Sequence, residues 1–98
     1  MDLLNVLKLN GTGLLEGLCR LEDRDNSFTK LKIFDKVRVN FSLGVESLCA
    51  YEVKVDSIDD MVLNCTITET ENEGMGIQLR IIIKDVGDFG RFEAFDYR

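Results

Sequence analysis

The sequence predicts a mainly β fold, an antiparallel meander that forms a small sandwich or barrel. Two observations favour this class: apolar and polar residues alternate with period two over most of the chain after Val37, and clusters of turn-forming residues separate the alternating runs. The length of 98 residues fits one domain, residues 1–98, with one modest hydrophobic core.

The first third of the chain is ambiguous between strand and helix. Leucines and a valine in residues 3–9 fit either element, and the leucines of residues 14–21 fit helical spacing as well as a strand interrupted by Gly17. Residues 10–13 (Asn-Gly-Thr-Gly) form a turn in both cases. Two strands would give a seven-stranded meander, whereas a helix at 14–21 would give an α+β fold with one short N-terminal helix over the sheet.

The next strand is predicted from its alternation. Val37, Val39, Phe41 and Leu43 share one face, and Arg38, Asn40 and Ser42 share the other. Leu31 and Ile33 extend the apolar face backwards, so we expect the strand to begin before Val37, with a bend or bulge near residues 34–36.

Three further runs alternate in the same way. Their expected inward residues are Cys49, Tyr51, Val53 and Val55; Leu63, Cys65 and Ile67; and Ile77, Leu79, Ile81 and Ile83. Residues 56–60 are predicted to be a tight turn and residues 72–74 a hairpin loop. Residues 87–90 are expected to be a loop with glycines at positive φ, followed by a strand at 91–97 that is covered on both faces.

The formal net charge of −6 comes entirely from the second half of the chain. Residues 1–48 contain seven acids and seven bases, while residues 49–98 contain eleven acids and five bases. This asymmetry favours a basic partner and makes nucleic-acid binding unlikely, because affinity for phosphate backbones comes largely from Lys and Arg.

Residue types disfavour most catalytic chemistry. The sequence has no histidine, which removes Ser-His-Asp triads, Cys-His dyads and the commonest general base near neutral pH. The acidic run at residues 23–27 resembles the start of a calcium loop but has Phe28 and Phe34 where glycine and glutamate are needed. We therefore expect a non-enzymatic protein with no metal or cofactor.

Cysteine usage and the start of the sequence bear on compartment. Cys19, Cys49 and Cys65 are widely spaced and odd in number, which favours reduced core thiols over a disulfide framework. We find neither the signature of a secretory signal nor a run of about 20 apolar residues. A cytoplasmic location without membrane insertion is the resulting expectation.

One basic stripe stands against the acidic background. Lys30, Lys32, Lys36 and Arg38 surround Phe34, an arrangement that could touch an anionic partner. Pairing across strands with Glu52 and Asp56 is the simpler interpretation of these cations.

The acidic segment from Glu52 to Glu73 has seven acids and one base, Lys54. Such a segment is either a solvated hairpin end or a surface that docks on a basic protein. We predict a protein-binding module, in its sharpest form an inhibitor or immunity-type protein. Its predicted contact residues are the acids of two hairpins and two aromatic anchors: Asp56, Asp59, Asp60, Glu69, Glu71, Glu73, Phe89 and Tyr97.

Two other functions fit the same pattern. The absence of proline leaves strand edges without proline protection, so the chain could be an assembly subunit that pairs its edges in a homo-oligomer. A barrel lined by Phe41, Tyr51, Ile77 and Leu79 could instead bind a small ligand if it enclosed a cavity.

Overall fold

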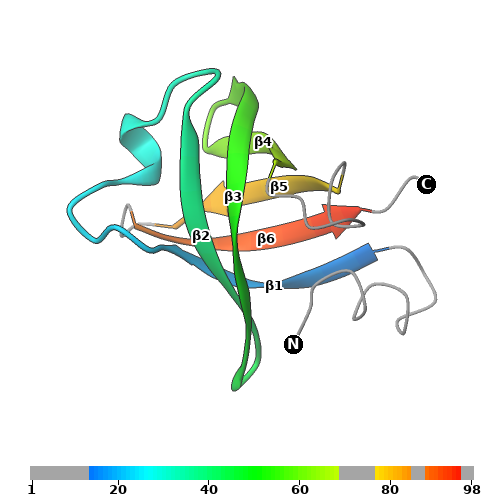
Figure 1. The fold of residues 1–98 in the computed structure, drawn as a ribbon. Coiled ribbons are helices and arrows are strands. Elements are labelled where there is room, and N and C mark those ends of the chain that lie inside the picture. The colour runs from blue at the N-terminus through cyan, green and yellow to red at the C-terminus, as the bar shows by residue number, and fades with distance from the viewer. Residues whose placement is uncertain (1–13, 69–76, 85–87, 96–98) are drawn as a thin grey trace.

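A computed structural model describes residues 14–68, 77–84 and 88–95. Its strands form a closed antiparallel barrel in chain order, with β1 paired to β6 (Figure 1). The predicted mainly β antiparallel class is therefore correct, in its barrel form. The strands are β1 (Leu14–Leu21), β2 (Lys36–Leu43), β3 (Glu46–Asp59), β4 (Val62–Ile67), β5 (Gln78–Ile83) and β6 (Phe89–Phe95).

Residues 14–21 form a strand, so the α+β alternative that placed a helix there is wrong. Leu15, Cys19 and Leu21 point into the barrel, while Leu14 and Leu18 lie on its exposed surface. Leu14–Arg20 pairs with β6, and Leu18–Leu21 also pairs with β2. These hydrogen bonds between strands satisfy backbone groups and override the helical spacing of the leucines. The first predicted element, residues 3–9, lies outside the described residues.

The connection between β1 and β2 differs from the predicted strand extension. Residues Phe28–Lys30 form a 3-10 helix, η1, and β2 begins only at Lys36. Leu31 is buried, but Ile33 is 49% exposed, so the two do not share a strand face. A turn between Lys32 and Asp35, closed by a backbone hydrogen bond of 3.0 Å from Asp35 to Lys32, reverses the chain where the sequence indicated a bulge.

β3 is longer than predicted. It continues through residues 56–59, where the sequence indicated a turn, because a register shift between Val55 and Ser57 inserts one extra residue opposite β4. The reversal occurs only at Asp60, which has φ 55°, and Met61. The turn-forming residues of this segment thus serve one bulge and one short turn.

The remaining strands confirm the predicted faces. Leu63, Cys65 and Ile67 of β4 are buried, as are Ile77, Leu79, Ile81 and Ile83 in and beside β5. β6 begins at Phe89, so Phe89 and Gly90 belong to a strand and Gly90 does not have positive φ. Phe92 is buried and Phe95 is partly buried; Tyr97 and the predicted loop at 72–74 lie outside the described residues.

The barrel interior is filled by its own side chains. The core gathers apolar residues from every strand together with Phe28 and Leu31 from the loop. Phe41 packs edge-on against Phe92 at 4.9 Å between ring centroids and contacts Tyr51 at 6.1 Å. Of the four residues expected to line a ligand cavity, Phe41, Ile77 and Leu79 are at most 1% exposed members of this packed core, and Tyr51 is partly buried and packs against it.

Within the described ranges, no helix has the length and apolar character needed to span a membrane.

Candidate protein-binding surface

The β3–β4 turn carries two of the predicted contact residues. Asp59 ends β3 and Asp60 follows it, and both are exposed. Aspartate tolerates the positive φ that the turn requires at residue 60 better than most residues do. Neither carboxylate forms an ion pair with a base in the described part of the chain, so both charges face solvent.

Two apolar side chains that the sequence analysis did not single out flank these carboxylates. Ile58 is 40% exposed and Met61 is 43% exposed. Ile58 lies opposite Leu63 in the β3–β4 ladder, and Met61 accepts a backbone hydrogen bond of 2.9 Å from Ile83 at the end of β5. We call residues 58–61 the acidic turn.

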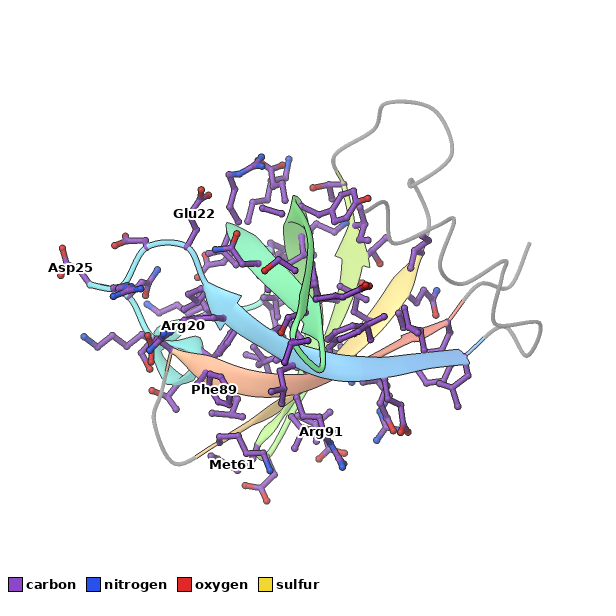
Figure 2. The ribbon with its side chains drawn as sticks, turned by 90° about the horizontal axis from the view of Figure 1, so that it is seen from below. Arg20, Glu22, Asp25, Met61, Phe89 and Arg91 are labelled. Atoms are coloured by element: carbon purple, nitrogen blue, oxygen red, sulfur yellow. The ribbon has the colours of Figure 1, made fainter. Side chains whose placement is uncertain are left out.

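The acidic turn lies at the same end of the barrel as Phe89. Met61 is bonded to the end of β5, and the next residue of that strand end, Lys84, donates a backbone hydrogen bond of 3.1 Å to the carbonyl of Phe89. Figure 2 shows Met61, Phe89 and Arg91 on one side of the barrel. Phe89 is partly buried, which suits an aromatic residue at the border of a contact surface.

Cations, however, surround Phe89. It lies opposite Arg20 in the β1–β6 ladder, and Arg20 forms an ion pair of 3.1 Å with Asp88. Arg91 is exposed on the outer face two residues further along β6. This end of the molecule therefore combines two carboxylates with neighbouring guanidinium groups, and only the acidic turn itself is strongly negative.

Asp56 is used locally. Its carboxylate accepts a hydrogen bond from the Thr66 hydroxyl and lies 3.7 Å from the Lys54 ammonium group. These contacts hold the bulge of β3 against β4 and leave less of the carboxylate available for a partner. Glu69, Glu71, Glu73 and Tyr97 lie outside the described residues, so their predicted roles stay predictions.

The position of Arg38 in the basic stripe agrees with the expected placement across from Glu52. Arg38 lies opposite Glu52 in the β2–β3 ladder, and its guanidinium group also forms an ion pair of 3.0 Å with Glu22 of the preceding loop. Lys36 lies opposite another cation, Lys54. Pairing with Asp56 is wrong for Lys36 and Arg38, since that carboxylate is engaged by Lys54.

The chain is not similar to any protein-family model, curated protein or solved structure with which it was compared. Its function must therefore be inferred from its own surfaces.

Surface grooves are lined by both polar and apolar residues. One groove, about 420 Å³, lies between the end of β1 and the start of β2 and is lined by Leu21, Glu22, Asp23, Asn26, Lys36, Val37 and Arg38. A second groove, about 290 Å³, includes Asp56, Asn64 and Arg80 over β4 and β5. Among the residues described, no group of three or more Cys, Asp or Glu side chains is arranged to hold a metal ion.

The buried thiols are poorly placed for nucleophilic chemistry. Cys19 and Cys65 are both free and buried in the core. Burial raises the pKa of each thiol from 9.0 to about 12, with a smaller contribution from Cys65 at Cys19 and from Asp56 at Cys65. The expectation of reduced core thiols is confirmed for these two; the side chain of Cys49 lies outside the description.

Proposed function

We propose that this protein is a non-enzymatic binding module that docks on a basic protein partner through the acidic turn. The observation that carries the proposal is the composition of that turn. Two solvent-facing carboxylates, Asp59 and Asp60, stand between the exposed apolar side chains of Ile58 and Met61.

This composition suits protein recognition. Apolar side chains that lose water at an interface supply much of the binding energy, and charges around them select a partner and accelerate encounter. A rigid hairpin tip also loses little conformational entropy on binding. Bonding of Met61 to β5 holds the tip against the barrel.

The proposed partner is basic because Asp59 and Asp60 are exposed and form no ion pair with a described base, and because the protein has a net charge of −6. The sharpest form of the proposal is an inhibitor or immunity-type protein that blocks a basic enzyme or toxin. Phe89 at the same end of the barrel would extend the contact on its apolar side.

The test is capture of a partner from native lysate at low and at moderate salt, compared between wild type and an Asp59→Asn/Asp60→Asn variant. Asparagine keeps the shape of the side chain and tolerates the positive φ at residue 60. We expect the captured basic protein to be released at moderate salt, and we expect the variant to bind it at least ten-fold more weakly.

The matched control is Asp25→Asn/Glu46→Gln, which removes the same two charges at exposed sites away from the acidic turn. It should retain near wild-type binding. Equal weakening by both variants would mean that only net charge matters, and unchanged binding by the Asp59→Asn/Asp60→Asn variant would refute a role for the acidic turn. An Ile58→Ser/Met61→Ser variant should weaken binding at every salt concentration, because it removes apolar contact area and salt screens only charge interactions.

A further inference from the structure

The loop between η1 and β2 presents a second surface of opposite character. Phe34 is 75% exposed and Ile33 is 49% exposed, side by side at the tip of the turn between Lys32 and Asp35. The lysines at 30, 32 and 36 are also exposed. We call residues 30–36 the lysine turn.

The backbone holds this tip rigidly. The Lys32 amide donates to the Asp35 carboxylate at 2.8 Å, and the Phe34 amide donates to the Val55 carbonyl at 2.8 Å. Phe28 and Leu31, buried in the core, anchor the segment before the turn. The two exposed apolar side chains are thus displayed by a braced structure, at a loop that extends beyond the end of β1 (Figure 1).

Phe34 occupies a strained conformation. Its φ of 76° lies in the region that L-residues other than glycine, asparagine and aspartate rarely adopt. The ring gains little burial in return, because three quarters of the residue faces solvent. Phe34 therefore adds backbone strain without burying its ring in the isolated molecule. This combination indicates that the ring contacts another surface.

The cations around the tip are uncompensated. Lys30, Lys32 and Lys36 form no ion pair with any carboxylate that the structure describes. Lys36 also lies directly opposite Lys54 in the β2–β3 ladder, and like charges at such positions destabilise a sheet. Two acids of this region have other partners: Asp35 accepts from the turn backbone, and Asp56 contacts Lys54 and Thr66.

We propose that the lysine turn docks this protein on an anionic membrane surface. Phe34 and Ile33 enter the interfacial region, while the three lysines stay at the level of the anionic headgroups. The turn exposes one aromatic ring, Phe34, beside one aliphatic side chain, Ile33. This pair suits a membrane surface better than single-stranded nucleic acid, which needs several aromatic rings along a basic groove. Lysine also reaches headgroups well with a long flexible stem and a compact charge.

The sequence offers a direct probe because it contains no tryptophan. A Phe34→Trp variant would carry a single indole at the tip. On addition of vesicles of phosphatidylcholine with phosphatidylserine, its emission should shift to the blue and be quenched by brominated lipid. Vesicles of phosphatidylcholine alone should give little change, and high salt should reverse the binding.

The matched control is Val45→Trp, which places the indole at the β2–β3 turn, where Val45 is 103% exposed and residues 43–46 include no lysine. It should show no shift on the same vesicles. A shift of equal size in both variants would show non-specific adsorption and overturn the proposal.

Sedimentation with the same vesicles measures binding without a fluorescent probe. It distinguishes the contribution of the lysine charges from that of the apolar side chain. Each single Lys→Gln change at 30, 32 or 36 should weaken binding roughly five-fold, and Phe34→Asn at least ten-fold. Phe34→Asn is a safe variant to fold, because asparagine tolerates the φ that strains phenylalanine. Wild-type protein that ignores anionic vesicles but binds an oligothymidine through Phe34 would replace the membrane with single-stranded nucleic acid and refute the proposal.

Discussion

The exposure and reactivity of a residue in this barrel depend on whether its side chain points into the core or outward to solvent. Cys19 and Cys65 point inward, among aliphatic side chains, and burial raises the pKa of both thiols to about 12. Their neighbours in sequence, such as Arg20 and Asn64, point outward and meet water or polar partners. One step along the chain therefore separates an unreactive thiol from a solvated charge.

This burial predicts a loss of stability in alkali. In the unfolded chain the thiols ionise near pH 9.0, while in the folded barrel they stay neutral up to about pH 12. The thiols do not lower the free energy of unfolding below pH 9. They lower it as the pH rises towards 12, because in this range the thiols of the unfolded chain release their protons and those of the folded barrel do not. The free energy of unfolding, measured with urea between pH 8 and 10.5, should fall more steeply for wild type than for a Cys19→Ala/Cys65→Ala variant. The difference in slope should be about 1–3 kcal/mol per pH unit above pH 9.

The double variant retains every lysine and tyrosine, so the difference between the two curves isolates the thiols. Parallel curves would contradict the assigned pKa values. Below pH 9 the variant should be less stable than wild type, since alanine leaves a small cavity at each site, and the two curves should converge as the pH rises.

At the scale of single elements, strand β1 depends on one residue without a side chain. Gly17 lies opposite Phe92 in the β1–β6 ladder, where the strand passes close to the end of β2. A Cβ atom at this position would lie 2.4 Å from the Ser42 carbonyl oxygen and 2.7 Å from the Phe92 ring. The glycine that made β1 ambiguous in the sequence is required by the packing of the strand.

Gly17→Ala should therefore destabilise the protein by about 2–3 kcal/mol, because backbone and a core ring must move to admit the methyl group. Gly44→Ala is the matched change. It has φ +56° and no atom within 4 Å of its Cβ position, so only backbone strain opposes alanine, at about 1 kcal/mol. Chemical denaturation measures the free energy of unfolding of both variants. A larger loss for Gly44→Ala than for Gly17→Ala would contradict the steric role of Gly17.

Alternation in the sequence identified the inward faces of β2 to β5 because each strand has one face in the core. It failed in the β1–β2 connection. Leu31 and Ile33 alternate like strand residues, yet a 3-10 helix and a tight turn bury the first and expose the second. Local pattern could not show this, since the Phe34 amide donates to the Val55 carbonyl of β3 and the Val55 amide donates to the Asp35 carbonyl, and these two hydrogen bonds fix the path of the turn.

For the molecule as a whole, closure of the barrel bears on the assembly alternative. β1 and β6 pair with each other over seven residues, from Leu14 with Phe95 to Arg20 with Phe89. The ends of the meander thus supply no free pair of strand edges along this seam. Proline protection, absent from the sequence, is not needed where edges pair within the chain.

We expect the protein to be a monomer of 11.1 kDa in the micromolar range, at low and at moderate salt. Light scattering measures this mass directly. A stable dimer or ring would instead favour the assembly subunit, with pairing through segments such as Glu46–Ala50 of β3, which among the described strands pairs with β2 alone.

The acidic turn and the lysine turn give the molecule two surfaces of opposite charge. The first comprises residues 58–61 and the second residues 30–36. If both proposals hold, the protein holds a basic partner at an anionic membrane, and each set of variants should affect its own ligand alone.

The sequence by itself determined the fold class, the single core, the faces of most strands and the acidity of the second half, because these follow from composition and period-two alternation. It also identified Asp60 as a turn residue, whereas Asp59, expected in the same turn, is the last residue of β3. The tertiary structure alone decided that the sheet closes, that β3 runs through a bulge to Asp59, and that Ile58, Met61 and Phe34 face solvent. These features depend on hydrogen bonds and contacts between segments far apart in the chain, and a local sequence pattern does not identify which distant segments pair.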